Sequence, residues 1–499
     1  MSGSPENLKK SAAEGLLWGA MFTLGRDVLQ FASMIVLVRL LSPEIYGQFA
    51  LAQTILLFLA VFSLKTFAPF ALQSREIETF DWDAHFSAGV VLNASVTGAM
   101  WAISAGLFLL GPETMRPLSL TLFVLSFTFI VEIIGTTYHT WLQAHHRWRH
   151  MRTLVFLGAI LSTVCAVVLA WLGAGVLALA SGPVVFGVPL VIDFFVRRPF
   201  AINFLPDWWS RYSEGRTFGL NRVLSTSLTT GSTLAEQSVL STMFGFGTLG
   251  IYTRAVGLAQ ITSGRVGPIV TQTLYPVLTR AEANTERFRR FADILFKGVL
   301  WVSAPAALFL ALEAESIVRL LYGEKWLDVI PLMAAGAALL ALRGLHLTMN
   351  QIMLANLQQK ACLTLDAVSS ISLLVVILSI AFMGPQIYLI ALSVHAAIIL
   401  FGTSYMAIRG GAVTAPSLIG NCAASVISLL ISGAITFFAL SLLSGETSGT
   451  YGSALRTLAS GLTLSVTYIC ALSILAPRGV RELLSLAPIP KLLPTTKRS

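Results

Sequence analysis

Charged residues are scarce in this chain, since only 11% of its 499 residues are Asp, Glu, Lys or Arg. Soluble domains carry about 25% charged residues, so the composition excludes an ordinary soluble globular protein. The chain also has only 4 cysteines, which lie singly in apolar stretches without a C-x-x-C pair. This spacing argues against a disulfide framework and against a cysteine-bound metal ion.

Long apolar runs fill the sequence instead. Hydrophobic residues make up 55% of the chain, and about 20 such residues in a row are needed to cross a hydrocarbon core of about 30 Å. We identify about fourteen runs of this length. They predict an all-α polytopic membrane protein whose spans are centred near Val28, Leu57, Ala94, Phe129, Thr163, Val185, Gly231, Val266, Ser303, Ala341, Leu374, Ala397, Ile431 and Leu464.

The motifs of soluble catalysis are missing from these runs. The sequence contains no phosphate-binding loop, nucleophile elbow or H-E-x-x-H zinc motif, each of which needs its residues at a fixed spacing. An ATP-driven pump is disfavoured because it requires a phosphate-binding loop in this chain or in a partner. We therefore predict a protein that is not an enzyme, with no cofactor and no metal site, that transports downhill or by coupling to H+ or Na+.

The distribution of positive charge predicts the orientation in the membrane. The formal net charge is +9. If the N-terminus lies inside, 21 of the 33 lysines and arginines fall in cytoplasmic segments and 4 in outer loops. Lys and Arg are enriched in cytoplasmic loops, so we predict that both termini are cytoplasmic. The same explanation makes a nucleic-acid partner unnecessary, and the sequence has no nucleic-acid-binding module.

A short internal repeat predicts two lobes. EIYGQFALAQ (44–53) follows the first span and GIYTRAVGLAQ (250–260) follows the seventh. Repeats of this kind are typical of transporters, whose binding sites lie at the repeat interface near the middle of the membrane. We predict an N-terminal lobe over 1–205, a C-terminal lobe over 206–412, each of six helices and related by pseudo-symmetry, and two further helices with a cytoplasmic tail over 413–499.

Eight cations fall within the predicted spans or at their ends, namely Arg26, Arg39, Lys65, Arg222, Arg254, Arg265, Lys297 and Arg343. Ionisable groups are costly there and usually face a bundle interior or a water-filled cavity. Arg39, Arg254 and Lys297 are the best candidates to reach an interface by snorkelling. Guanidinium groups match phosphate oxygens, so an anionic ligand in a cationic cavity is one interpretation. A network of ion pairs that fixes helix packing is the other. The predicted cavity set is Arg26, Lys65, Arg222, Arg254 and Arg265.

Four acids lie comparably deep and are candidates for ion coupling or for pairing with these cations: Asp27, Glu132, Glu236 and Asp366. In the eighth span, Pro268 and Pro276 remove backbone hydrogen bonds and predict a kink. The kink would either bend during transport or be a static packing feature.

The stretch HTWLQAHHRWRH (139–150) is rich in histidine, and the spacing of its histidines on a helix could suggest a metal site. Its histidines are His139, His145, His146 and His150, and no acid or cysteine lies near them in the sequence. We interpret the stretch as a collar of Trp, Arg and His at the membrane interface, where it could meet lipid phosphates.

Several motifs together resemble polysaccharide and oligosaccharide flippases of the multidrug/oligosaccharidyl-lipid/polysaccharide exporter superfamily. They are LSPEIYG (41–47), LGIYTRAVGLAQ (249–260), TQTLYPVLTR (271–280) and AESIVRLLYGEKWLDVIPLM (314–333). The matches extend from about residue 8 to residue 335, and the last four spans fit by hydropathy only.

The resemblance implies alternating access around a central cationic cavity. The implied cargo is a polyprenyl-diphosphate-linked oligosaccharide repeat unit, moved from the inner to the outer leaflet of the bacterial cytoplasmic membrane for exopolysaccharide or lipopolysaccharide synthesis. Implied partners are membrane lipids and a polysaccharide polymerase. With such a cargo, we predict that Arg26 faces the cavity and helps to hold the diphosphate or an acidic sugar, while Asp27 either tunes it or serves in ion coupling. Two alternatives stay open: a lipid II-type flippase or other exporter of the superfamily, and, more remotely, a polysaccharide polymerase or ligase.

Overall fold

The computed structural model describes residues 5–73, 79–279, 285–380, 383–443 and 450–486. Within these residues the side chains of 5–20, 73, 221, 224, 225, 259, 261–279, 380, 442–443, 450–453 and 484–486 lie outside the description. Every regular element in the described part is a helix. The all-α prediction is therefore confirmed.

The chain divides into two compact units, Met1–Gly250 and Ile251–Ser499. The helices that begin in the first unit are α1 (Pro5–Leu40), α2 (Pro43–Ala60), α3 (Leu64–Phe67), α4 (Pro69–Gln73), α5 (Trp82–Leu110), η2 (Glu113–Met115), α6 (Arg116–Ala144), α7 (Trp148–Trp171), α8 (Val176–Phe186), α9 (Val188–Arg197), α10 (Trp208–Arg211) and α11 (Ser213–Thr279). The last of these, α11, continues into the second unit. The predicted lobe boundaries, which follow the sequence repeat, stay a prediction.

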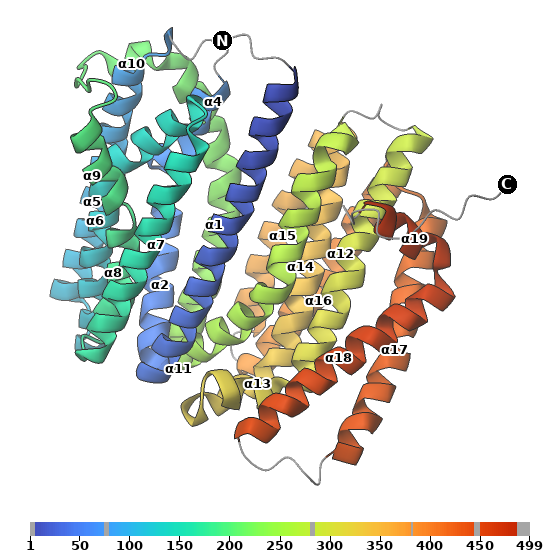
Figure 1. Ribbon diagram of the computed structural model, residues 1–499. Helices are drawn as coiled ribbons and strands as arrows, with labels where there is room; N and C mark the ends of the chain where they lie inside the picture. Colours follow the sequence, from blue (N-terminus) through green and yellow to red (C-terminus); the bar gives the residue numbers. More distant parts are fainter. Residues whose placement is uncertain (1–4, 74–78, 280–284, 381–382, 444–449, 487–499) are drawn as a thin grey trace. The chain divides into compact units, whose positions relative to one another are not determined.

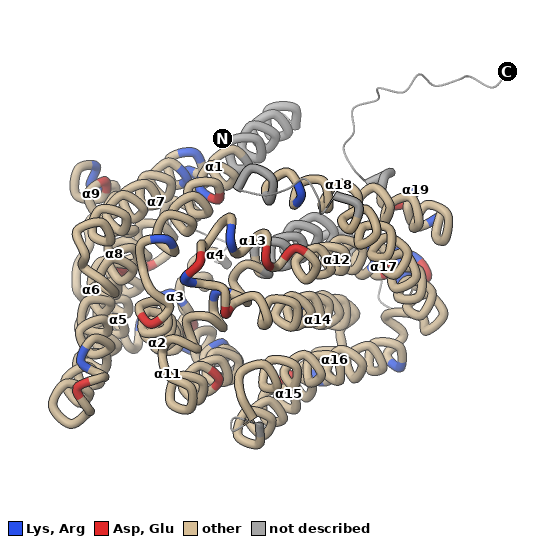
Figure 2. The backbone as a smooth tube through the Cα atoms, turned by 90° about the horizontal axis from the view of Figure 1, so that it is seen from below, with Lys and Arg blue, Asp and Glu red and all other residues tan. Residues whose placement is uncertain are grey.

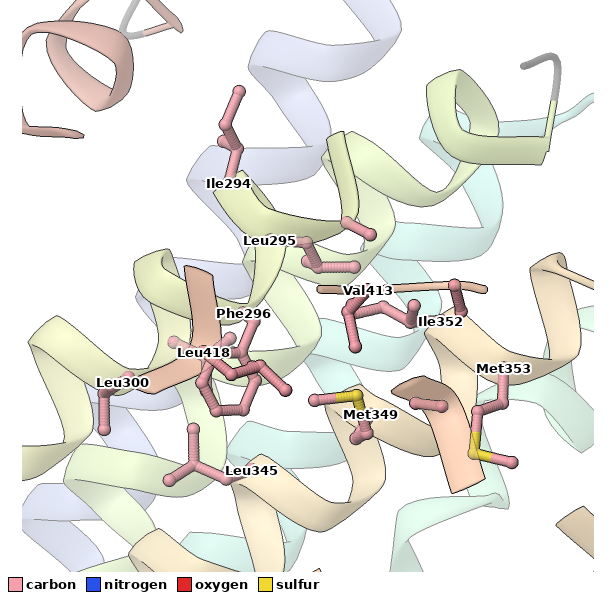
Figure 3. Packing of buried hydrophobic residues seen from close by; sticks show 14 of the residues in the cluster. Ile294, Leu295, Phe296, Leu300, Leu345, Met349, Ile352, Met353, Val413 and Leu418 are labelled. Carbon is pink, nitrogen blue, oxygen red and sulfur yellow. The ribbon is translucent and has the colours of Figure 1, made fainter. Parts of the chain in front are cut away.

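The second unit continues with helices whose bounds are α12 (Glu286–Leu312), α13 (Ala314–Leu321), η3 (Glu324–Val329), α14 (Ile330–Ala355), α15 (Gln359–Ile380), α16 (Pro385–Arg409), α17 (Ala415–Leu443), α18 (Thr450–Leu475) and α19 (Pro477–Leu486). Its core forms where α12 packs on α14 and α17. Figure 3 shows Leu295 and Phe296 of α12 beside Met349 and Ile352 of α14, with Leu418 of α17 close by. Side chains of this kind, buried on several helices at once, hold the unit together.

Eleven described helices are long and apolar enough to cross a membrane, and a twelfth is counted if the bent pair Pro43–Ala60 and Leu64–Leu72 is one span. Figure 2 shows how few positions along the described backbone carry a charge. These observations confirm a polytopic helical membrane protein.

The bent span is held by a buried amide of a neighbouring helix. Its two parts meet at 51°, and the break leaves backbone groups that need partners inside a membrane. The side chain of Asn93 on α5 accepts a hydrogen bond from the Leu64 amide at 3.0 Å and donates one to the Phe129 carbonyl oxygen of α6 at 3.0 Å. Asn93 thereby fixes the start of α3, and with it Lys65, against α6.

Close helix contact within the first unit brings the first repeat motif against Gly250, the first residue of the second motif. A Cβ atom at Gly47 of α2 would overlap the carbonyl oxygen of Phe246, and one at Gly250 would overlap the carbonyl oxygen of Pro43. Nearby, α11 is interrupted at Gly245, whose φ of 81° suits glycine. Small residues permit such backbone approach between membrane helices, which explains why each motif contains a glycine at this place.

The remaining helices of the first unit form the frame of the candidate site. Figure 1 shows α1 running alongside α7, while α5 to α9 form the rest of the bundle. At one end of this bundle the turn between α6 and α7 is closed by a hydrogen bond from the Arg147 amide to the Leu142 carbonyl oxygen, 2.9 Å. His146 in this turn has a φ of 55°, a left-handed conformation that is more usual for glycine.

Candidate functional site

Two arginines share a small cavity between α1, α6 and α7 of the first unit. Its volume is about 240 Å³, and its polar lining comes from Thr23 and Arg26 of α1, Gln143 of α6, and Trp148 and Arg152 of α7. We call it the arginine cavity. It contains one residue of the predicted cationic set, Arg26, and one residue outside that set, Arg152.

The guanidinium groups in this cavity each have a donor without a hydrogen-bond partner among the described residues. Arg152 donates one long hydrogen bond, 3.4 Å, to the hydroxyl of Thr23. The Nε atoms of Arg26 and Arg152 are buried and have no hydrogen-bond partner among the described residues. Buried donors of this kind are costly unless a ligand or water satisfies them. The cavity is therefore chemically suited to an anion with several oxygens.

The adjacent acid, Asp27, only partly neutralises Arg26. The closest approach of their charged atoms is 3.6 Å, and the two side chains are 37% and 20% exposed. Neighbouring residues of a helix do not face each other, so a contact between positions i and i+1 leaves most of the guanidinium surface available. Arg26 therefore lines the arginine cavity while it keeps its contact with Asp27.

A second cavity of about 310 Å³ lies between α3, α4, α6, α8 and α9. We call it the lysine cavity, because Lys65 of α3 projects to it and pairs with Glu132 of α6, Nζ to Oε1, at 2.5 Å. Glu132 is only 14% exposed, and its other oxygen, Oε2, has no hydrogen-bond partner in the described part of the chain. A desolvated carboxylate with one free oxygen is a reasonable place to take up a proton or a cation.

Helix α6 connects the two cavities through a polar stripe. Glu132, Thr136, His139 and Gln143 all line the lysine cavity, and Gln143 also lines the arginine cavity. At about 100° per residue, their spacings of four, three and four residues place them within about 60° of one helix face. Sequence reasoning identified Glu132 as a deep acid and His139 only as part of the histidine-rich stretch, although the spacing of the four polar residues on an apolar helix was a usable signal.

Of the other predicted cations, Arg222 lines neither of these cavities, and Arg254 belongs to the second unit. Arg222 is exposed on α11 in the first unit, and Arg254 is half-buried on α11 in the second. The backbone carbonyl oxygen of Arg254 accepts a 3.5 Å hydrogen bond from Tyr322. The side chain of Arg265 lies outside the described residues. One cavity that holds all five predicted cations therefore stays a prediction.

The two remaining predicted acids, Glu236 and Asp366, lie on two different helices, α11 and α15. Glu236 is buried on α11, at 3% exposure, whereas Asp366 of α15 accepts a 2.9 Å hydrogen bond from the Asn350 amide of α14. Their role in ion coupling stays a prediction. The same holds for the kink at Pro268 and Pro276, whose side chains lie outside the described part.

Lys297 corrects one expectation, because it does not snorkel to an interface. Its side chain is 3% exposed, and its Nζ lies 3.1 Å from Asp293 Oδ2 and 2.6 Å from Glu482 Oε2. Asn421 of α17 also donates to Asp293, at 2.6 Å, and Arg290 pairs with Glu482 at 3.2 Å. This network ties α12 to α17 and α19, so it has a structural role in the second unit. Arg39 is exposed, and its position at a membrane interface stays a prediction.

The histidine-rich stretch also has an acidic partner that the sequence did not reveal. Asp193 of α9 accepts hydrogen bonds from Tyr138, 2.6 Å, and Arg197, 2.9 Å, and its Oδ2 lies 2.7 Å from His150 Nε2. The acid comes from a helix more than 40 residues away in the sequence, which is why local spacing missed it. No group of three or more His, Cys, Asp or Glu suited to a metal occurs among the described residues.

A family model described as polysaccharide biosynthesis protein matches residues 36–331, more than half of the chain. The chain belongs to this family. Lipopolysaccharide biosynthesis protein WzxC of Escherichia coli (strain K12) is 23% identical over 331 residues, 66% of this chain and 66% of WzxC. Succinoglycan biosynthesis transport protein ExoT of Rhizobium meliloti (strain 1021) is 25% identical over 339 residues, 65% of each chain. The match therefore spans about two thirds of the length of these relatives.

Solved structures show the same fold. The lipid II flippase MurJ in an inward closed conformation has a TM-score of 0.72 at 14% identity, covering 93% of this chain and all of that one. An inward-facing multidrug resistance MATE family transporter of the MOP superfamily has a TM-score of 0.60 at 17% identity, covering 78% of this chain and 95% of that chain. The resemblance to polysaccharide flippases of this superfamily is confirmed, and the chain is a multi-pass protein of the bacterial inner membrane.

Proposed function

We propose that this protein is a flippase that moves a polyprenyl-diphosphate-linked oligosaccharide repeat unit from the inner to the outer leaflet by alternating access. The arginine cavity carries the proposal, because it places two incompletely bonded guanidinium groups side by side inside a membrane helix bundle. Membership of a polysaccharide biosynthesis family supports the oligosaccharide, and the names of WzxC and ExoT support synthesis of lipopolysaccharide or exopolysaccharide. The protein would act as a transporter without catalysing a covalent step.

The proposed topology has fourteen spans with both termini in the cytoplasm. The structure supports eleven spans and the bent twelfth. Helix α11 has 67 residues and a break at Gly245, which is long enough for two further spans. The orientation rests on the excess of Lys and Arg in the segments that this topology places inside.

In the proposed bound state, Arg26 and Arg152 would contact the diphosphate. Arginine presents a planar fork of donors that matches phosphate oxygens, and the amide of Gln143 and the hydroxyl of Thr23 would supply neutral donors. Asp27 would keep the net charge low enough for release, since a stronger anion site would hold the cargo. Binding that is favourable but reversible is what a transport cycle requires.

The lysine cavity is the proposed place of ion coupling. Protonation of Glu132, or a cation at its free oxygen, would weaken its attraction to Lys65, and the freed ammonium group could then attract the anionic cargo through the shared wall at Gln143. H+ and Na+ are both candidates for the coupling ion. A polysaccharide polymerase, which would use the exported repeat unit, is the proposed protein partner.

An analysis of lipids from depleted cells tests the proposal. Cells that lose this protein should accumulate a diphosphate-linked oligosaccharide on the cytoplasmic side, shielded from a glycan-modifying enzyme added to the periplasm. The mass of that lipid would identify its sugars. If single repeat units instead appear unpolymerised on the outer face, the protein acts after the flip, and the polymerase or ligase alternative replaces ours.

A further inference from the structure

A second basic site lies at the turn between α6 and α7, outside the two cavities described above. It is a hollow of about 450 Å³ lined by Arg147, Arg149, Arg197, His146, His150, Trp148 and Thr153. We call it the basic hollow. Three of these seven residues are arginines, and none is an acid. The lining therefore carries a net positive charge at neutral pH.

One wall of the basic hollow is held in place by Asp193. This carboxylate contacts Arg197 at 2.9 Å and His150 at 2.7 Å, so it positions two lining side chains from α9 and α7. Arg197 nevertheless stays 55% exposed. Asp193 thus bonds to one of the three lining arginines, and the lining itself contains no acid.

The turn between α6 and α7 places a residue of the basic hollow, His146, in a strained backbone conformation. His146 lies in a left-handed conformation, with a φ of 55°, that costs a residue with a side chain about 1 kcal/mol. Glycine would avoid this cost, yet the chain places an exposed histidine there, followed by Arg147, which lies over the ring of Trp141 at 5.1 Å. Strained positions of this kind point to a function for the side chain.

Trp148 separates the basic hollow from the arginine cavity. It lines both the basic hollow and the arginine cavity, and its ring is 40% exposed. Tryptophan next to arginine at the end of a membrane helix is typical of the level of lipid headgroups. A group bound in the hollow would therefore lie at the membrane surface, one side chain away from the arginine cavity.

We propose that the basic hollow binds the phosphate group of a lipid headgroup. Arginine forks from α7 and α9 match the phosphate oxygens, and the position beside Trp148 matches a headgroup held at the surface. The inference needs only the membrane location of the protein and does not depend on the proposed transport activity. If that activity is correct, the hollow is also suited to receive the cargo headgroup before the arginine cavity does.

Lipid binding by the purified full-length protein tests the site. Delipidated protein in neutral detergent would be titrated with phosphatidylglycerol and with phosphatidylcholine, and the bound lipids would be counted by native mass spectrometry. We expect the double variant Arg147→Gln with Arg149→Gln to bind phosphatidylglycerol about 10-fold more weakly and phosphatidylcholine unchanged. A variant with equal loss of charge, Arg116→Gln with Arg409→Gln, should bind both lipids like the parent protein.

Three outcomes would overturn the proposal. The first is unchanged phosphatidylglycerol binding in the Arg147 and Arg149 double variant. The second is an equal loss in the charge-matched control, which would indicate a general effect of net charge. The third is displacement of phosphatidylglycerol by inorganic pyrophosphate at similar concentration, which would assign the hollow to a soluble phosphate. The variant Arg147→Lys with Arg149→Lys keeps both charges and guards against misfolding, because it should retain most of the binding.

Discussion

Replacing Arg152 by Gln is the sharpest test of the arginine cavity. The substitution removes a guanidinium group whose only hydrogen bond in the described structure is a long one to Thr23, 3.4 Å. Hydrogen bonds to charged groups contribute about 1.5–3 kcal/mol, and 1.4 kcal/mol corresponds to a factor of about ten in affinity. We expect diphosphate-lipid binding to weaken about 10- to 100-fold. The free energy of unfolding should change by less than about 1 kcal/mol, because little native bonding is lost.

The assay is flipping of a fluorescent polyprenyl-diphosphate oligosaccharide in proteoliposomes, measured over a range of cargo concentrations. The variant should require more cargo for half-maximal rate. The cargo concentration for half-maximal rate of Arg152→Lys should lie between those of the parent protein and Arg152→Gln. Lysine keeps the charge of arginine but lacks its planar fork of donors. Arg116→Gln is the matched control, since Arg116 is 56% exposed and pairs only with the exposed Glu113 among the described acids. Normal cargo dependence in Arg152→Gln, together with normal dependence in Arg26→Gln, would refute the cavity as the binding site.

Three further predictions follow from other parts of the structure. Exchanging the first pair, Arg26→Asp with Asp27→Arg, should abolish flipping if Arg26 faces the cargo, whereas retained flipping would show that the two residues form a mere structural pair. Lys297→Met leaves two acids without their buried cation, so the unfolding free energy should fall by about 3 kcal/mol or more, measured as a lower melting temperature in detergent; an unchanged melting temperature would contradict the buried network. Gly47→Ala should lower the unfolding free energy by about 1–3 kcal/mol, because the added Cβ atom overlaps α11. Its control is Gly98→Ala on α5, where an added Cβ atom meets nothing within 4 Å, so the melting temperature should stay equal or rise slightly. Equal effects of the two substitutions would disprove the close contact.

The sequence by itself determined the class of protein and most of its helices. Apolar runs of membrane length are a local property, because lipid requires each helix to satisfy its own backbone groups. The predicted centres therefore fall inside helices of the structure, and LSPEIYG (41–47) together with three further motifs indicated the family. The position of Arg26 within the first span was also readable, since the Arg26–Asp27 pair lies inside a long run of mostly apolar residues.

Only the tertiary structure decided which charges meet. Arg152 stands beside Arg26 because α1 packs on α7, although the two residues are 126 positions apart. Lys297 is buried because acids from its own helix and from α19 surround it, and Asp193 gives the histidine-rich turn a partner from another helix. Electrostatic contacts depend on distances of a few ångströms. Hydropathy and spacing along the chain fix which residues lie in the membrane, and helix packing alone fixes which of them are neighbours.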